Sequence, residues 1–241
     1  MKTRKVIIAL IAFIAISVIV LISLFWFGII HFNNPPSDSI IGIDVSSYQG
    51  DIDWKTLSSQ KISFAFIKAT EGSSFVDPCF KKNWVNAADT DLRIGAYHFF
   101  SFESSGEKQA ELFCSSVTPT DNMLPPVIDV EFYSRFKSVK DINTADVKHE
   151  LRIMVDLISA EYAMKPIIYA TNESFEAIVK NDFSDCELWF RSVYSSMPDE
   201  IEAAFWQFSN RHRLDGYNGK EPYIDMDVFC GSSEEFANYP N

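Results

Sequence analysis

Eight short apolar runs constrain the fold of this chain more than any other feature of its sequence. They cover residues 40–45, 62–69, 92–100, 126–131, 166–171, 187–193, 203–208 and 223–229, and helix-like segments lie at 79–89, 107–117 and 145–163. Strands that alternate with helices form parallel sheets, and eight of them suggest closure into a barrel. We therefore predict an α/β fold, an irregular eight-stranded (β/α) TIM-like barrel. Segment 209–222 is too short and too rich in Gly and Asn for a good helix, so we expect the end of the barrel to be irregular, with antiparallel pairing as one option.

The amino-terminal region contains an uncharged run from Val6 to Ile30. At a rise of about 1.5 Å per residue, such a run exceeds the roughly 30 Å of a bilayer core. We predict that one transmembrane helix precedes the barrel. A secretory signal peptide has an apolar core of only about 7 to 15 residues and a small-residue cleavage site, so an uncleaved anchor is favoured. Lys2, Arg4 and Lys5 precede the run and no Lys or Arg follows before Lys55, which predicts a cytoplasmic amino terminus.

These features divide the chain into four parts. They are a cytoplasmic amino terminus at 1–5, a membrane anchor at 6–30, a linker at 31–39 and the barrel at 40–241. The linker contains Asn33-Asn34-Pro35-Pro36, which disfavours helix and separates the anchor from the domain. We expect a monomeric, single-pass membrane protein whose barrel lies outside the cytoplasm.

The charge and the cysteines of the part that follows the anchor limit the partners and cofactors that it can bind. The chain carries 21 basic and 33 acidic residues, and its acidic residues all follow the anchor. An acidic domain repels phosphate backbones, so we expect no nucleic-acid partner. Cys79, Cys114, Cys186 and Cys230 allow one or two disulfides, in any of three pairings, or unpaired buried thiols. Neither their spacing nor that of the four histidines predicts a metal site, and we expect no cofactor.

Four carboxylates lie at or near the expected strand ends. Asp129 and Glu131 close the run 126–131, and side chains at i and i+2 of a strand leave on one face. Asp44 lies near the end of the first run, and Asp225 lies inside the last one, where an unpaired buried charge would be costly. The active face of such a barrel is formed by the carboxyl ends of its strands, so we predict that these acids meet there. Taken singly, each acid is also explained as a capping or salt-bridged carboxylate, which is our interpretation of Asp227.

A cluster of acids in one cleft fits cleavage of a glycosidic bond. One group protonates the leaving oxygen while another supports the positive charge that grows on the sugar. Neighbouring negative charge raises the pKa of the least solvated acid. We assign that protonated role to Glu131, the candidate general acid, and expect Asp129 and Asp44 to stay ionised.

Aromatic side chains near the strand ends are candidates for stacking on sugar rings. Aromatic faces pack on the apolar faces of sugars, and Tyr and Trp add a polar group. His98 faces away from its neighbours Tyr97 and Phe99, which predicts a hydrogen-bonded core histidine. The candidate substrate-binding residues are Tyr97, Tyr169, Trp189, Tyr48 and Trp206.

Several ordered motifs together resemble the glycoside hydrolase family 25 lysozymes. The opening stretches are 42–50 (GIDVSSYQG), 52–54 (IDW) and 64–72 (FAFIKATEG), and the later ones are 95–99 (GAYHF), 126–131 (PVIDVE) and 205–209 (FWQFS). The likeness covers about residues 40–230. It implies a barrel enzyme that cleaves the β-1,4 bond between N-acetylmuramic acid and N-acetylglucosamine, and a bacterial cytoplasmic membrane as the site of the anchor.

The resemblance also implies roles for single residues. Glu131 matches the general acid, and Asp129 matches the group that orients the substrate's acetamido group for substrate-assisted attack. Asp44 and Asp225 match the other acids of the groove, and peptidoglycan glycan strands are the implied partner. Arg191 stands where many members have a small residue, and Asp227 stands where Asn is common, which leaves substrate preference open.

Two other functions remain possible at this point. A chitinase-like hydrolase of N-acetylglucosamine polymers uses similar acetamido chemistry. A catalytically silent module would bind cell walls without releasing reducing ends, but the intact acids argue against it.

Overall fold

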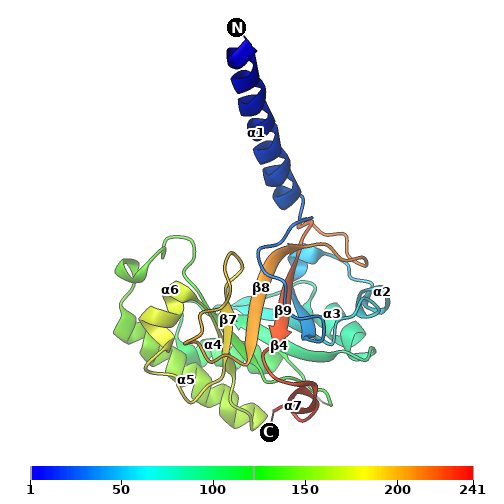
Figure 1. Ribbon diagram of the computed structural model, residues 1–241. Coiled ribbons are helices and arrows are strands. Elements are labelled where there is room, and N and C mark those ends of the chain that lie inside the picture. The colour runs from blue at the N-terminus through cyan, green and yellow to red at the C-terminus, as the bar shows by residue number, and fades with distance from the viewer. Residues whose placement is uncertain (1, 122, 241) are drawn as a thin grey trace.

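The eight apolar runs form the eight strands of a closed barrel in the computed structural model, which describes residues 2–121 and 123–240 (Figure 1). The strands are β1 (Ile40–Val45), β2 (Phe64–Glu71), β4 (Arg93–Phe99), β5 (Val127–Val130), β6 (Ile167–Thr171), β7 (Leu188–Arg191), β8 (Phe205–His212) and β9 (Ile224–Phe229). A short additional strand, β3 (Phe75–Val76), pairs with the end of β2 and lies outside the closed ring. The predicted eight-stranded barrel is therefore confirmed.

The barrel is mixed and mostly parallel. Successive pairs from β1 through β2 and β4 to β8 are parallel, whereas β9 runs antiparallel to both β8 and β1. The connection between β8 and β9 carries no crossover helix in its described residues, and only an antiparallel pair can be joined in that way. Gly216 in this connection has φ of 104°, a conformation that favours glycine. The antiparallel option at the end of the barrel is thus the correct one.

Three helices cover the outside of the barrel: α3 (Phe80–Ala88), α4 (Gly106–Ser116) and α5 (Thr144–Tyr162). They lie within two residues of the predicted segments. The other connections are shorter. They contain α2 (Trp54–Ser58) and α6 (Asn172–Ser174), which continues into a π-helical turn at Phe175–Val179, while residues 192–204, all described, contain no helix. A regular β/α repeat therefore does not extend around the whole ring.

Strand alternation divides the interior into two cores. One set of side chains packs between the sheet and the helices, and the other fills the lumen of the barrel. Gly42 and Gly95 face the lumen, where an added Cβ would lie 2.3 Å from the Phe64 ring and 2.6 Å from the Phe66 ring. These two glycines make room for the large rings that fill the lower lumen. The lumen cluster consists of Phe64, Phe66, Leu124, Val127, Ile167, Tyr169, Trp189, Phe205, Phe229, Phe236 and Tyr239.

The end of the barrel opposite the strand carboxyl ends is closed by the last part of the chain. Helix α7 (Ser233–Ala237) places Phe236 against the rings of Phe64 and Phe229. The Arg93 guanidinium donates to the Phe236 carbonyl at 2.6 Å and also to the carbonyl of Tyr239. Only the other end of the lumen is left open to polar groups.

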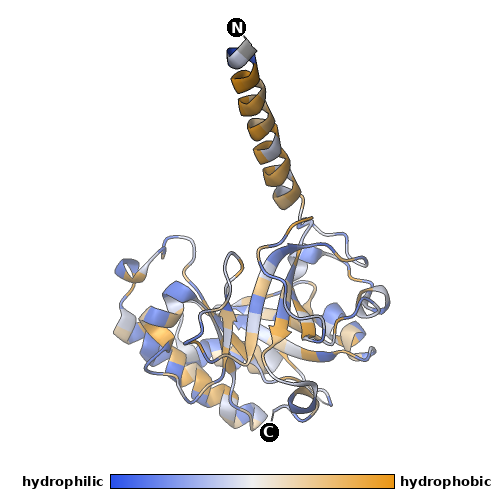
Figure 2. Cartoon of the chain, viewed as in Figure 1, coloured by the Kyte–Doolittle hydropathy of each residue, from blue (hydrophilic) through white to orange (hydrophobic). Residues whose placement is uncertain are grey.

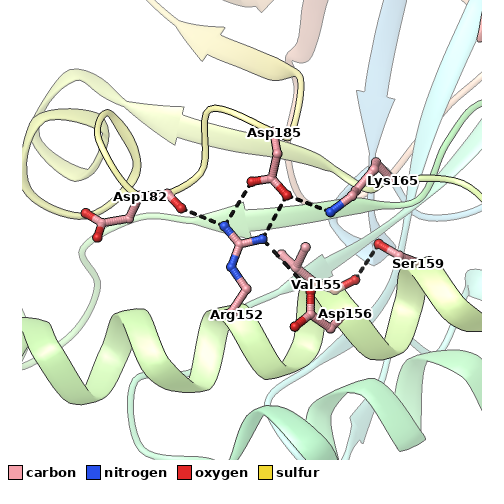
Figure 3. Close-up of polar contacts among 7 residues, drawn as sticks. All are labelled: Arg152, Val155, Asp156, Ser159, Lys165, Asp182 and Asp185. Carbon is pink, nitrogen blue, oxygen red and sulfur yellow. Dashed lines mark hydrogen bonds and ion pairs between the residues drawn. The ribbon is translucent and has the colours of Figure 1, made fainter.

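A charged cluster fixes α5 to the turn that precedes β7 (Figure 3). The Arg152 guanidinium donates to both carboxylate oxygens of Asp185, at 2.9 and 3.0 Å, and to the Asp182 carbonyl at 2.6 Å. Lys165 donates to the same Asp185 carboxylate at 2.6 Å. These bonds lower the pKa of Asp185 well below its usual range. The cluster lies on the outer surface and stabilises the frame rather than the open end of the lumen.

The amino-terminal run forms α1 (Lys2–Trp26), which projects away from the barrel and contacts it at its carboxyl end (Figure 1). An 18-residue window within Thr3–Trp26 has a mean hydropathy of 3.2 and is not buried inside the protein, and Figure 2 colours most of the helix as hydrophobic. The helix ends at Trp26, four residues before the end of the uncharged run at Ile30, and Gly28 adopts φ of 65°. Length and composition permit either a membrane anchor or a signal sequence.

The predicted linker is fixed to the barrel by Asn33. Asn33 is only 6% exposed, and its side-chain amide donates to the carbonyls of Ser192 and Phe208, each at 2.9 Å. Two hydrogen bonds to buried or partly buried carbonyls outweigh the tendency of an Asn- and Pro-rich stretch to remain extended and solvated. The four cysteines are unpaired thiols, so the alternative without disulfides is the one observed.

Candidate active site

A groove of about 510 Å³ opens at the carboxyl ends of the parallel strands. Its size suits a small-molecule or sugar ligand. The walls are polar because the lumen positions change from apolar to polar toward this end of each strand. The groove is lined by Asp44, Ser46, Tyr48, Gln49, Lys68, Tyr97, Phe99, Asp129, Glu131, Tyr169, Trp189, Arg191, Gln207, Asn210, Arg211, Glu221, Tyr223 and Asp225.

Strand geometry brings the four predicted acids together. On β5, Val127 fills the lumen, Asp129 lies one pleat higher, and Glu131 lies just past the end of the strand. Asp44 on β1 is paired in register with Asp225 on β9. Because β9 runs in the opposite direction, a residue near its start reaches the same rim as residues near the ends of the other strands. All four acids line one groove.

A hydrogen-bonded chain fixes the Asp44 carboxylate. The side-chain amide of Gln207 donates to Asp44 Oδ2 at 2.7 Å, and the Tyr169 hydroxyl donates to Gln207 Oε1 at 3.0 Å. Gln207 was not among the predicted site residues. The signal for it was available, because a polar residue one pleat above the lumen-filling Phe205 must face the open end of the barrel.

Asp227 lies directly below this chain. It is fully buried, and its Oδ1 accepts the indole N–H of Trp189 at 2.9 Å. Burial raises the pKa of Asp227 well above its usual range, and the charges of Asp44 and Asp225 raise it further. The interpretation of Asp227 as a capping or salt-bridged carboxylate is therefore wrong. Its position in the middle of β9 puts it out of reach of a cation and beside the indole instead.

The electrostatics of the cluster are dominated by desolvation. Burial raises the pKa of Asp44 to about 7 and raises the pKa of Asp129 well above the usual value, in both cases assisted by the charge of Glu131. Burial also raises the pKa of Glu131, but the nearby cations Arg191 and Lys68 oppose this effect. The expectation that Asp129 and Asp44 stay ionised while Glu131 alone holds a proton is thus not supported, because the two aspartates are more deeply buried than Glu131. The acids form one proton-sharing group.

Two buried carboxylate oxygens of these acids, Asp129 Oδ1 and Asp227 Oδ2, have no hydrogen-bond partner among the described residues, and of the two residues Asp129 is the one that lines the groove. A buried acceptor without a donor is costly. Since Asp129 lines the groove, a donor N–H or O–H on a ligand is the natural partner for its Oδ1.

Two cations lie among the acids. The Lys68 ammonium donates to Glu71 at 2.7 Å and lies 4.9 Å from the centre of the Phe99 ring. Arg191, the last residue of β7, also lines the groove, and its guanidinium makes no hydrogen bond or ion pair with the residues that the structure describes. Its guanidinium is available to a ligand.

Four of the five predicted aromatic residues line the groove. Tyr48, on the short turn Ser47–Gln49, is 64% exposed and can offer a ring face, whereas Tyr169 and Trp189 are 6% and 2% exposed and offer little more than ring edges. Tyr97 also lines the groove.

Trp206 is the exception and is not a groove residue. Its side chain leaves the opposite face of β8 from Gln207, its indole N–H donates to the Ser192 carbonyl at 3.0 Å, and its ring packs near Phe208. His98 is a buried core residue, as predicted, with ring nitrogens 2.7 Å from Thr70 Oγ1 and 3.1 Å from Gln109 Oε1. Burial lowers the pKa of His98 to about 4.

Comparison with known proteins identifies relatives along most of the chain. The family model described as glycosyl hydrolases family 25 matches residues 43–217. A solved family 25 glycosyl hydrolase from Bacillus anthracis superposes with a TM-score of 0.80 and 50% identity, covering 88% of this chain and 98% of that one. Lysozyme M1 of Streptomyces globisporus is 29% identical, with coverage of 86% of this chain and 74% of its own length. The uncharacterized protein YegX of Escherichia coli K12 is 34% identical over 85% of this chain and 75% of its own.

Proposed function

The chain belongs to glycosyl hydrolases family 25 and is a glycoside hydrolase, and on that premise we propose that it is a muramidase. Its substrate is peptidoglycan, and the bond that it cleaves is the β-1,4 bond between N-acetylmuramic acid and N-acetylglucosamine. The observation that carries this proposal is the meeting of four carboxylates from three strands in one sugar-sized groove.

Glu131 is the general acid in this proposal. It lies at the top of β5, where it is less buried than Asp129 and is able to reach an exposed glycosidic oxygen. Burial raises the pKa of Glu131, which favours the protonated form that a general acid needs. That proton passes to the oxygen of the leaving sugar as the glycosidic bond breaks.

Asp129 positions the substrate's own nucleophile. Its unpartnered Oδ1 accepts the N–H of the acetamido group, which turns the acetamido carbonyl oxygen toward the anomeric carbon. The carbonyl oxygen forms the new bond while the glycosidic oxygen leaves. Water then opens the cyclic intermediate and gives a proton back to Glu131. The protein supplies no covalent nucleophile, which distinguishes this scheme from the usual pair of carboxylates.

Asp44, Asp225 and Gln207 complete the site. Gln207 orients the Asp44 carboxylate, and the cluster as a whole stabilises positive charge on the sugar. Arg191 balances part of this negative charge and is the candidate determinant of which glycan is preferred. Tyr48 offers the stacking surface for a sugar ring.

We also propose that the enzyme is a single-pass membrane protein with residues 1–5 in the cytoplasm and its catalytic barrel, residues 40–241, outside. The support is the length and hydropathy of α1 and the lysines and arginine that precede its apolar part. Alkaline extraction of membranes tests this proposal. Retention of the full-length chain in the membrane is expected, and release of a shortened chain would identify α1 as a signal peptide.

Mass spectrometry of the sugars released from purified peptidoglycan tests the activity. Fragments with N-acetylmuramic acid at the new reducing end are expected. Release of fragments from chitin oligomers but not from peptidoglycan would identify a chitinase-like hydrolase instead. Binding to sacculi without any new reducing ends would identify a silent wall-binding module.

A further inference from the structure

The carboxyl end of α1 contacts the rim of the groove directly. The carbonyl of Trp26, the last residue of α1, accepts a hydrogen bond from the Tyr223 hydroxyl at 2.5 Å and another from the Arg211 guanidinium. The same guanidinium lies over the rings of Phe25 and Trp26, at 5.6 and 5.2 Å from their centres. Both Arg211 and Tyr223 line the groove. The helix and the active site are therefore separated by a single layer of side chains on this side.

Residues 27–33, which we call the docked segment, hold the barrel in this position. The His31 ring stacks on the His212 ring with centres 3.6 Å apart and planes 10° apart. Phe32 packs edge-on against Tyr194, and the Asn33 amide binds two carbonyls of the barrel. The hydrogen bonds and the ring contacts both stabilise this arrangement. The docked segment is therefore a rigid connection between α1 and the barrel, not a flexible linker.

The direction of the strands shows which end of the barrel the docked segment contacts. The docked segment contacts residues that follow β7 and lie at the end of β8, which is the end of the barrel where the groove opens. In Figure 1, α1 leaves from that end, whereas α7 and the C-terminus lie at the opposite end. A bilayer spanned by α1 thus lies on the groove side of the barrel.

The residues at this junction suit a membrane surface. With 25 residues, α1 is about 37 Å long and spans a bilayer core of roughly 30 Å, so Trp26 lies at its boundary. Trp and Tyr are enriched at that boundary, and Arg side chains reach from it to lipid headgroups. Arg213 lies beside Arg211 with its guanidinium 4.9 Å from the centre of the Tyr223 ring, so an otherwise acidic chain presents cations there.

We propose that the groove faces the bilayer and that the enzyme cleaves glycan strands while they are still held at the membrane surface by a lipid. This inference rests on the proposed muramidase activity and membrane anchor, and it specifies their substrate. A groove held against the bilayer by hydrogen bonds receives strands that lie in the thin layer beside the membrane. Mature wall at a greater distance is out of its reach.

Fluorescence energy transfer to an acceptor in the lipid headgroups tests the orientation without any need for activity. The full chain is reconstituted in vesicles of anionic and neutral phospholipids, with a single labelled cysteine. One variant carries Ser196→Cys on the exposed loop after β7 with the four native cysteines changed to Ser, and the other retains only Cys230, which is exposed beyond the far end of β9. Stronger transfer from position 196 than from Cys230 is expected. Equal transfer, or stronger transfer from Cys230, would overturn the proposal.

The length of the lipid-linked products tests the substrate. Glycan strands attached to a lipid are placed in the same vesicles as the wild type or as a variant with a 20-residue Gly/Ser insertion between Ile30 and His31. Such an insertion has a root-mean-square length of about 25 Å and lets the barrel move away from the bilayer. The wild type is expected to leave short stubs on the lipid, and the insertion variant is expected to leave longer ones. Stubs of the same length distribution from both proteins would contradict the proposal.

Two controls separate this inference from the proposed function. The same Gly/Ser sequence added at the amino terminus lengthens the chain on the other side of the membrane and is expected to leave the stub length unchanged. The full chain in detergent micelles is assayed on free glycan strands. If it does not cleave them, the muramidase proposal fails, while the energy-transfer result still decides the orientation.

Discussion

Replacement of Glu131 by Gln is the most direct test of the site. The substitution keeps the size and shape of a side chain that is only partly buried, so the fold tolerates it. It removes the proton that the glycosidic oxygen must receive. It also removes the charge that, after desolvation, contributes most to raising the pKa of Asp129.

The expected loss of activity follows from the role of the residue. A positioned general acid contributes about 10²- to 10⁴-fold to the rate, which corresponds to about 2.7 to 5.4 kcal/mol of transition-state free energy. Asp129, Asp44 and Asp225 are also carboxylic acids with raised pKa values, but they lie deeper in the lumen or on the opposite wall. We therefore expect kcat to fall by at least about 10²-fold, with little change in binding of the glycan.

The assay is the release of reducing ends from purified peptidoglycan by the Glu131→Gln variant, with binding to sacculi and thermal unfolding measured in parallel. The matched control is Glu202→Gln, which makes the same change at an exposed residue outside the groove. Wild-type kcat in the Glu131→Gln variant would refute the assignment of the general acid. An equal fall in both variants would show that the loss does not report on the groove.

Four further substitutions probe the electrostatics and the aromatic residues. Burial raises the pKa of Asp44 from 3.8 to about 7, so the folded protein binds a proton that the unfolded chain has lost. The free energy of unfolding therefore falls, on the order of a few kcal/mol, as pH rises between these two values. In Asp44→Asn, the melting temperature should fall less over this pH range, and the same fall as in the wild type would contradict the prediction. Arg191→Gln removes the cation that most lowers the pKa of Glu131, so the basic limb of the pH profile of kcat should move to higher pH, and a shift to lower pH would disprove the assignment. Trp189→Phe leaves the buried Asp227 without its indole donor and should lower the free energy of denaturant unfolding by about 1–3 kcal/mol. Trp206→Phe should leave kcat/KM unchanged, because the indole lies outside the groove. A loss of activity in Trp206→Phe would place Trp206 in the site.

The main features of the fold were predictable because they depend on local patterns. Each apolar run became a strand because its residues alternate between two buried faces, and the pairing of Asp129 with Glu131 on one face follows from the same rule. Asp225 was predictable because burying an unpaired carboxylate in an apolar strand is costly, so its presence there indicates a functional role. Trp206 was wrongly predicted because the alternation was not applied to β8, where a lumen-facing Phe205 and Gln207 require Trp206 to face outward.

The features that were missed depend on contacts between distant parts of the chain. Gln207 binds a carboxylate 163 positions away, and Asn33 binds carbonyls 159 and 175 positions away. A local sequence pattern cannot predict hydrogen bonds to residues so far away along the chain. The Asn- and Pro-rich stretch was therefore interpreted as a linker. The relative burial of Asp129 and Glu131 likewise depends on how all strands tilt around the lumen, which the sequence does not specify.

The pairing of β1 with β9 has a consequence for how this protein is made. Ile40 on β1 is paired with Phe229 on β9. The first strand of the barrel therefore cannot complete its pairing, and the barrel cannot close, until the last strand has been synthesised. The entropy of closing so long a loop makes this a late step, and until then β1 exposes an unsatisfied edge. For the membrane-anchored enzyme that we propose, export would deliver an open, aggregation-prone sheet beside the membrane. We then expect the yield of active enzyme to depend on how quickly translocation finishes relative to proteolysis and self-association of that intermediate.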